Sequence, residues 1–247
     1  WKCERRIMKE RELFIGLDVG SVSLNTVVMD KRGEILEEHY HRIKGRPLET
    51  VDRVLKEILS RVDVSAIRGV YVTGMGGKRV AELLDGAFVN EVIAHAKAVR
   101  ILYPEVRTII EMGGEDSKLI LLKATGEKGL EIVDFSMNTL CAAGTGSFLD
   151  QQANRLKLAI EDLGPLALKS KSPPRVAGRC SVFAKSDMIH LQQAAAPDYD
   201  IVAGLCYAVA RNFKGNIGRG IKMLPPVSFQ GGVAANLGVR KAFRDIL

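Results

Sequence analysis

The sequence predicts an α/β protein built from two related lobes in tandem, and three observations carry this prediction. Apolar runs of strand length alternate with segments that have the apolar spacing of amphipathic helices. The segments FIGLDVGSVSLNTVVMD and TIIEMGGEDSKLILLK share one scheme: an apolar strand, an acidic residue, a glycine turn with small polar residues, and a second apolar strand. The 247 residues, of which 47% are apolar, are enough for two modest lobes with a real core.

The first lobe is predicted over residues 13–103, after an N-terminal extension of residues 1–12. Its strands are expected at Leu13–Val19, Val22–Met29, Ile35–Ile43 and Gly69–Val72. Its helices are expected at Thr50–Val62, Arg79–Leu84 and Val92–Leu102.

The second lobe is predicted over residues 104–247. Its strands are expected at Val106–Met112, Lys118–Leu122, Leu130–Phe135 and Val227–Gln230. Its helices are expected at Gly144–Leu156, Ile160–Leu168, Val182–Gln193 and Ile201–Ile217, before a closing helix. The chain lacks an initiating Met and stops inside a helical pattern, so we expect a domain of a longer polypeptide with a truncated C-terminus.

Charge and hydropathy narrow the class of protein. The formal net charge is +7, but basic and acidic residues are interspersed, which disfavours nucleic-acid binding and suits a polyanionic ligand such as a nucleotide or a CoA ester. No apolar run has the length of a membrane span, and the charged N-terminus does not resemble a signal peptide. We therefore expect a cytoplasmic protein whose four cysteines are buried, reactive or metal-binding rather than disulfide-bonded.

The first glycine turn follows the first strand and suits a phosphate group. Gly20 lets the backbone approach an anion closely, and Ser21, Ser23 and Asn25 add side-chain donors. Asp18 stands where a hydrated Mg²⁺ beside the phosphates requires a carboxylate.

Two further glycine turns follow the same logic. The second offers Gly113, Gly114, Asp116 and Ser117. The third, Gly231–Gly232, lies between a strand and a helix, where a sugar or base can pack against bare backbone. Each turn alone is more often an ordinary turn, but three in this order favour a nucleotide. The chain contains neither a P-loop motif nor a dinucleotide-binding G-x-G-x-x-G after a strand.

The three turns are similar to the two phosphate motifs and the adenosine motif of the acetate and sugar kinase, Hsc70 and actin superfamily. That resemblance implies two ribonuclease-H-like lobes with ATP in the cleft between them.

Two cysteines stand before predicted helices, Cys141 in CAAGTGSF and Cys180 in CSVFAKSD. The unpaired N–H groups and the dipole of a helix N-terminus stabilise a thiolate. Two thiolates are too few for a zinc or iron–sulfur site, which typically takes four, but a symmetric homodimer supplies four. The alternative is that both are buried structural cysteines. Cys3 and Cys206 are interpreted in this way.

Five motifs together resemble one family, the 2-hydroxyacyl-CoA dehydratase activators, which includes the ATPase subunits of benzoyl-CoA reductase. These are LDVGSVS, EMGGEDSK, NTLCAAGTGSFLDQQANRL, VAGRCSVFAKSDMIHLQQ and FQGGVAAN. The resemblance implies an ATPase that couples hydrolysis of ATP to low-potential one-electron transfer. It also implies a homodimer that holds one [4Fe–4S] cluster through Cys141 and Cys180 of each protomer.

The resemblance also assigns roles around the nucleotide. Asp18 would orient Mg²⁺, and Glu111 and Asp116 would assist with metal or water. The residues expected to contact ATP or ADP are Gly20, Ser21, Ser23, Gly113, Gly114, Ser117, Gly231, Gly232 and Val233. The implied partners are an iron–sulfur dehydratase or reductase that acts on an acyl-CoA, and an electron donor such as ferredoxin or flavodoxin, in anaerobic metabolism.

Two departures from the family pattern bear on these expectations. Glu111 stands where the short activators have Asp, and Glu115 replaces an amide, which changes how Mg²⁺ and water are held. The Cys141 segment looks more like that of the long multidomain members, so the cluster is shared either with an identical domain or with a paralogous tandem repeat.

Two other functions compete with the activator. One is a redox-silent small-molecule kinase of the same superfamily, which would need a catalytic base in the cleft. The other is a cluster-bearing interaction domain with a vestigial ATPase. The two cysteine–helix motifs favour the activator over the kinase, and measurable hydrolysis would separate it from the interaction domain.

Overall fold

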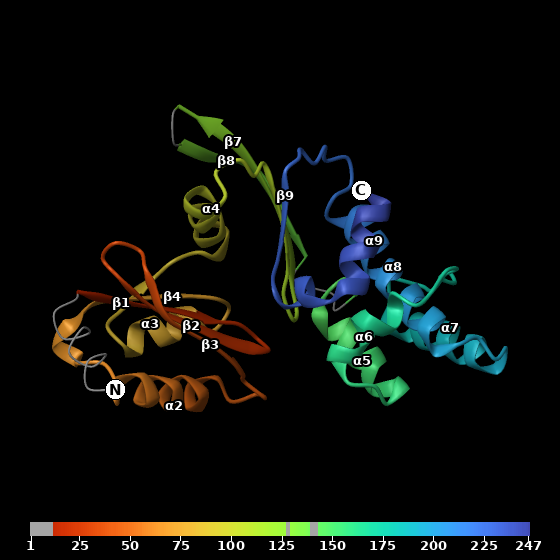
Figure 1. Ribbon diagram of the computed structural model, residues 1–247, viewed down its shortest axis with the longest axis horizontal. Helices are drawn as coiled ribbons and strands as arrows, with labels where there is room; N and C mark the ends of the chain where they lie inside the picture. The colour runs from red at the N-terminus through yellow and green to blue at the C-terminus, as the bar shows by residue number, and fades with distance from the viewer. Residues whose placement is uncertain (1–11, 127–128, 139–142) are drawn as a thin grey trace. The chain divides into compact units, whose positions relative to one another are not determined.

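The computed structural model describes residues 12–126, 129–138 and 143–247. It divides into two compact units, one that ends at Ala94 and one that comprises His95–Leu247. Each unit has its own mixed sheet, in which an antiparallel hairpin precedes a parallel strand (Figure 1). The α/β prediction is therefore confirmed.

The first unit is a five-stranded sheet with the order β3-β2-β1-β4-β5. Its strands are β1 (Leu13–Val19), β2 (Ser23–Asp30), β3 (Ile35–Arg42), β4 (Ile67–Thr73) and β5 (Ala87–Phe88). Its helices are α2 (Pro47–Leu59), the 3-10 helix η1 (Val64–Ala66) and α3 (Gly77–Leu83).

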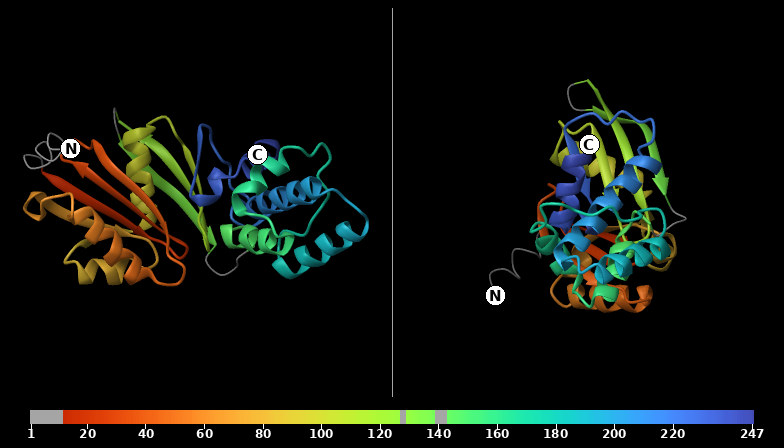
Figure 2. Two further views of the ribbon diagram at one scale, coloured as in Figure 1. Left: turned by 60° about the horizontal axis from the view of Figure 1, so that its bottom comes forward. Right: turned by 90° about the vertical axis from the view of Figure 1, so that its right-hand side faces the viewer.

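Alternation along β1 decides which side chains enter the core of this unit. Ile15 and Leu17 are buried and belong to one apolar cluster with Val54 of α2 and Val80 of α3. Helices α2 and α3 both lie against one face of the sheet (Figure 2). Because successive side chains of a strand point to opposite faces, Asp18 lies on the other face.

The second unit is a four-stranded sheet with the order β8-β7-β6-β9. Its strands are β6 (Thr108–Met112), β7 (Ser117–Thr125), β8 (Gly129–Asn138) and β9 (Val227–Gln230). Helix α4 (Glu91–Leu102) begins before the boundary between the units. The helices that follow are α5 (Gly146–Leu156), α6 (Ile160–Ala167), α7 (Ser181–Gln193), α8 (Asp198–Asn216), the 3-10 helix η2 (Gly232–Ala235) and α9 (Leu237–Ile246).

Helix α8 is the centre of the second core. Its residues Leu205, Val209 and Phe213 are fully buried and share an apolar cluster with Ile110 and Met112 of β6. Successive side chains of a strand alternate between its two faces, so Glu111, which lies between Ile110 and Met112, faces the other side of the sheet. Both units therefore present one acidic residue, at the end of the first strand, on the face opposite their main core.

The predicted elements occur in the predicted order, with shifts at their ends. Helix α5 begins at Gly146 rather than Gly144, because Gly144 has φ +88° and Thr145 is extended. Helix α8 begins three residues before Ile201, where Pro197 precedes its first turn. Among the described residues, every helix is too short or too polar to cross a bilayer.

Candidate functional site

The first glycine hairpin joins β1 to β2. Asp18 and Asn25 are register partners, and the Asn25 amide nitrogen donates to Asp18 Oδ2 at 3.1 Å. The backbone N–H of Gly20 donates to the carbonyl of Ser23 at 3.0 Å and closes the turn, with Ser21 inside it. The hairpin thus holds one carboxylate by a neutral amide, beside a turn built of small residues.

A further glycine turn, at the end of β4, contacts this carboxylate. Thr73 pairs with Asp18 on the neighbouring strand, and Gly74 follows with φ +91°. A Cβ atom on Gly74 would lie 2.5 Å from the Val19 carbonyl oxygen and 2.7 Å from Asp18 Oδ1. The buried hydroxyl oxygen of Thr73 has no hydrogen-bond partner among the residues that the structure describes.

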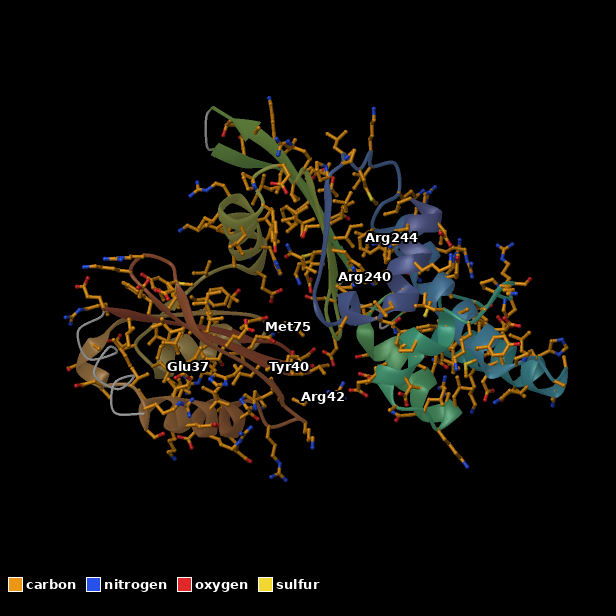
Figure 3. The ribbon with its side chains drawn as sticks, in the orientation of Figure 1. Glu37, Tyr40, Arg42, Met75, Arg240 and Arg244 are labelled. Atoms are coloured by element: carbon orange, nitrogen blue, oxygen red, sulfur yellow. The ribbon has the colours of Figure 1, made fainter. Side chains whose placement is uncertain are left out.

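Sequence reasoning gave this turn, in TGMGGK, no role. The signal was nevertheless present, since a strand followed by a glycine turn also precedes η2 and α9 in the second unit. Figure 3 marks Met75 of this turn, together with Tyr40 and Arg42 of β3. By register, Tyr40 shares the sheet face of Asn25, and Arg42 that of Ser23.

The second glycine hairpin joins β6 to β7 and contains a buried ion cluster. The Lys118 ammonium group lies 2.9 Å from Glu111 Oε2 and 2.7 Å from Asp116 Oδ2. Lys118 is 2% exposed, and Glu111 is 5% exposed. The N–H of Gly113 donates to the carbonyl of Asp116 at 3.0 Å, as in the first turn. Sequence reasoning named both carboxylates but missed the lysine that pairs with them.

Burial dominates the electrostatics of Glu111. Loss of solvent raises the pKa of its carboxyl group, while the charge and the hydrogen bond of Lys118 act in the opposite direction. The positive charge of His95 would also lower this pKa, and the negative charge of Asp116 raises it. Lys118 therefore favours the ionised form of a carboxylate that burial alone would disfavour.

His95 reaches this region from α4. Its Nδ1 atom lies 2.7 Å from Gln230 Oε1, and the Gln230 amide nitrogen donates to Ser228 at 2.9 Å. Gln230 is the register partner of Glu111 on the adjacent parallel strand, so the two side chains share one face. Lys118, Glu111 and Gln230 thus form a polar row across β7, β6 and β9.

The third glycine turn follows β9. Gly231 has φ +84°, and a Cβ atom there would lie 2.3 Å from the Met112 carbonyl oxygen and 2.7 Å from Glu111 Oε1. Gly232 is exposed with open space around it, and Val233 is buried.

Helix α9 follows this turn. Its first turn is capped by the Asn236 side chain, which accepts from the N–H of Val239 at 3.1 Å. It carries two exposed arginines, Arg240 and Arg244, one helical turn apart (Figure 3). Both cations stand on the helix that follows the third glycine turn and η2, which suits an anionic ligand.

Two members of the predicted phosphate set are engaged by the protein itself. The Ser117 hydroxyl is fully buried and donates to the carbonyl of Gly144 at 2.7 Å. The carbonyl of Gly114 accepts from the N–H of Ser147 at 2.7 Å. The side chain of Ser117 and the carbonyl of Gly114 therefore tie the second hairpin to the start of α5.

Of the two predicted cluster ligands, Cys141 lies outside the described residues. Cys180 is a free, partly exposed thiol that precedes the 13-residue helix α7 as its N-cap residue, and it makes no side-chain capping bond. Cys206 is fully buried in α8, and burial raises the pKa of its thiol to about 12. Within residues 12–126, 129–138 and 143–247, no three His, Cys, Asp or Glu side chains converge on a metal position.

These residues fit the predicted groups to different degrees. Asp18 supplies the carboxylate that Mg²⁺ prefers, and the glycine at position 74 keeps space open beside its Oδ1 atom. Cys180 supplies one thiol of the class that iron–sulfur clusters require, at the N-terminus of α7. Cys206 is instead fully buried among the apolar residues of the second core.

Comparison with known proteins identifies related chains. Residues 15–247 match the model of the BadF/BadG/BcrA/BcrD ATPase family. The 2-hydroxyisocaproyl-CoA dehydratase activator of Clostridioides difficile is 33% identical over 231 residues, which are 92% of this chain and 84% of the relative.

Two solved structures share the fold. Component A of the Acidaminococcus fermentans (R)-2-hydroxyglutaryl-CoA dehydratase has a TM-score of 0.85 and 30% identity, over 94% of this chain and 88% of that chain. The activator of the 2-hydroxyisocaproyl-CoA dehydratase from Clostridium difficile, with bound ADPNP, has a TM-score of 0.85 and 31% identity, over 94% and 85%.

Proposed function

The chain belongs to the BadF/BadG/BcrA/BcrD ATPase family, and on this basis we propose that it is an ATP-dependent activator of an acyl-CoA dehydratase or reductase. It hydrolyses ATP and uses the free energy to deliver one electron at low potential. The observation that carries the proposal is the combination of two matched glycine hairpins with a free thiol before α7, in a chain that aligns with a dehydratase activator over 92% of its length.

The nucleotide is held by the three predicted turns. The backbone of Gly20, Gly113 and Gly114 binds phosphate oxygens, with Ser21 and Ser23 as hydroxyl donors. Ser117 contributes through its backbone, because its hydroxyl is bonded to Gly144. The adenosine part is contacted by Gly231, Gly232 and Val233. Support comes from the open space at Gly232 and from the ADPNP in the related activator structure.

The acidic residues have different roles in the hydrolysis of ATP. Asp18 orients a hydrated Mg²⁺, which neutralises charge on the phosphate oxygens when bound. Glu111 and Asp116 orient the attacking water. Lys118 holds these two carboxylates in fixed positions, so that little reorganisation is needed when the substrate arrives.

Cys141 and Cys180 from each of two protomers, or from a protomer and a paralogous repeat, would hold a [4Fe–4S] cluster, which would supply one-electron transfer when bound. Four thiolates are the usual ligand set of such a cluster. Cys180 precedes the first turn of α7, and the positive end of the helix dipole would favour electrons on a bound cluster. ATP and ADP drive the change by binding two conformations with different affinity.

The remaining assignments follow from this role. The electron acceptor is an iron–sulfur dehydratase or reductase, the donor is a ferredoxin or flavodoxin, and the setting is the cytoplasm of an anaerobe. Support for a dehydratase as the acceptor comes from the names of the related activators.

The proposal is tested by iron, acid-labile sulfide and EPR analysis of protein purified without oxygen, together with ATP hydrolysis. About four irons per two chains are expected, lost in Cys141→Ser and in Cys180→Ser. Cys206→Ser is the matched control and should keep the iron, since its thiol is buried and protonated. ATP binding without any iron after reconstitution would instead favour the redox-silent kinase.

A further inference from the structure

The first two residues of α5, and Gly144 just before them, are hydrogen-bonded directly to the second glycine hairpin. The N–H of Gly146 donates to the carbonyl of Gly113 at 2.9 Å, and the N–H of Ser147 donates to the carbonyl of Gly114 at 2.7 Å. The Ser117 hydroxyl donates to the carbonyl of Gly144 at 2.7 Å. Three hydrogen bonds therefore connect residues 144–147 to the turn that is proposed to bind phosphate.

Close packing reinforces these hydrogen bonds. A Cβ atom on Gly146 would lie 3.0 Å from the Gly113 carbonyl oxygen and 3.4 Å from Gly114 Cα. Only a glycine at position 146 therefore allows the start of α5 to rest on the hairpin without a shift of either backbone. This contact gives the glycines of AAGTG a structural reason that is independent of any cluster.

Asn212 of α8 connects this segment to the one that precedes Cys180. Its side chain is 6% exposed, and its amide nitrogen donates to the carbonyl of Gly178, two residues before Cys180. Its Oδ1 atom lies 2.7 Å from where a Cβ atom of Gly144 would be, so Gly144 packs directly against it. Asn216 donates to the same Oδ1 atom at 3.0 Å and fixes the orientation of the amide.

We propose that Ser117 and Asn212 are positioning residues that transmit the nucleotide state from the second hairpin to the two cysteine segments. Ser117 connects the hairpin to the residues after Cys141, and Asn212 connects those residues to the ones before Cys180. This inference rests on the proposed function, because it assumes that the hairpin binds phosphate and that the cysteines hold a cluster.

The physical basis is the planarity of the peptide group. The carbonyl of Gly113 and the N–H of Gly114 belong to one rigid plane, so an N–H that turns toward a phosphate turns the carbonyl with it. That carbonyl is already bonded to Gly146, the first residue of α5. A rotation of this peptide plane therefore strains the start of α5, unless the hydrogen bond between Gly113 and Gly146 breaks.

The test is hydrogen–deuterium exchange of iron-free protein with Mg²⁺ and either ADP or ADPNP, each at a concentration that saturates the variant studied. In the wild type, we expect exchange to differ between the two nucleotides in peptides that cover residues 143–150 and residues 175–183. Ser117→Ala should reduce both differences by at least half. Asn212→Ala should preserve the difference at 143–150 and reduce the one at 175–183 by at least half.

The matched control is Thr108→Val, which also removes a fully buried hydroxyl that donates to a backbone carbonyl, at the other end of β6. It should leave both differences at the wild-type level. If Asn212→Ala does not fold, Asn212→Asp replaces it, because the carboxylate keeps the shape of the side chain and cannot donate to Gly178.

The outcomes distinguish failure of the proposed function from failure of the positioning roles of Ser117 and Asn212. Absence of nucleotide binding by calorimetry in the wild type would overturn the proposed function. Nucleotide binding without exchange differences in residues 143–150 and 175–183 would overturn the inference alone. The inference would also be overturned if Ser117→Ala and Asn212→Ala both kept the wild-type exchange differences between ADP and ADPNP. In iron-loaded protein, Ser117→Ala should also raise the amount of ATP hydrolysed per electron delivered.

Discussion

The two glycine hairpins have the same backbone frame but hold different charges. In both, a glycine two residues after the acidic residue donates its N–H to a carbonyl three residues further on, at 3.0 Å in each case (Gly20 to Ser23, Gly113 to Asp116). In each unit, the strand that pairs in parallel with the first strand of the hairpin is followed by a glycine with a left-handed backbone. Gly74 and Gly231 have φ of +91° and +84°, and a Cβ atom on either would lie 2.7 Å from a carboxylate oxygen.

The difference lies at one position of the second strand in each hairpin. Asp18 faces the neutral amide of Asn25, whereas Glu111 faces the ammonium group of Lys118, which also binds Asp116. The ammonium group of Lys118 largely compensates the charge of Glu111, whereas the amide of Asn25 carries no charge that could compensate that of Asp18. The comparison teaches that a repeated backbone frame can hold its carboxylate with a neutral amide in one unit and with an ammonium group in the other.

The largest expected effect is on stability, from removal of the lysine. Lys118→Met leaves two carboxylates next to each other in a buried position, and should lower the free energy of unfolding by about 3–5 kcal/mol. The corresponding change in the first unit, Asn25→Leu, should cost about 1 kcal/mol, because it removes one neutral hydrogen bond. Urea denaturation of both variants gives the comparison.

A double variant separates charge from packing in this prediction. Lys118→Met with Glu111→Gln removes one of the unpaired charges and should recover a large part of the lost stability. Equal costs for Lys118→Met and Asn25→Leu would contradict the view that the two hairpins differ in charge.

The next effect tests whether the two frames are equivalent. Gly74→Ala and Gly231→Ala should each destabilise by roughly 2–4 kcal/mol, because a left-handed backbone and a clash with a carbonyl act together. Gly33→Ala is the control, with φ +82° and nothing within 4 Å of the added Cβ, and should cost about 1 kcal/mol. A cost at either site no larger than that of the control would break the equivalence.

Much of this arrangement could be predicted from the sequence because it is local. The repeated strand–acid–glycine–strand scheme placed both hairpins and their carboxylates at the correct strand ends. The faces of the side chains depend on register, which a one-residue shift reverses. Ser117 resembles a phosphate ligand in sequence, but it pairs with Met112 on the core face, while Lys118 pairs with Glu111 on the polar face.

Other contacts have no local signature at all. Asn212 lies 34 residues from Gly178 and still farther in sequence from Gly144, in a helix whose pattern indicates only a buried core element. His95 and Gln230 are 135 residues apart. Such pairs arise from the packing of whole elements, so propensity and spacing carry no information about them.

A third prediction concerns divalent cations and sharpens the assignment of the metal. Asp18→Asn should raise the Mn²⁺ concentration for half-saturation about tenfold in the presence of ADP, which corresponds to about 1.4 kcal/mol. Glu111→Gln should change it far less, because the charge of Glu111 is compensated by Lys118. The EPR signal of free Mn²⁺ measures binding without hydrolysis. Asn25→Lys, which copies the second hairpin into the first, should weaken Mn²⁺ binding as Asp18→Asn does.

The smallest effect concerns the residues that stand beside the two carboxylates. Gln230, next to Glu111, is hydrogen-bonded to His95 and Ser228, whereas the buried hydroxyl oxygen of Thr73, next to Asp18, has no partner in the described part of the chain. A buried polar atom without a partner is costly, so its retention points to a partner that arrives with a ligand. Thr73→Val should therefore leave the stability of the nucleotide-free protein unchanged or raise it by up to about 1 kcal/mol.

The same variant should weaken the binding of ADP with Mg²⁺, which calorimetry measures. Gln230→Met is the matched change in the second unit and should lower stability by about 1 kcal/mol through its lost hydrogen bonds. A Thr73→Val protein that is less stable, yet binds nucleotide as the wild type does, would assign the hydroxyl to the fold. Opposite signs for stability and affinity would show that the first unit keeps a polar position ready for its ligand, while the second unit fills the equivalent position with its own side chains.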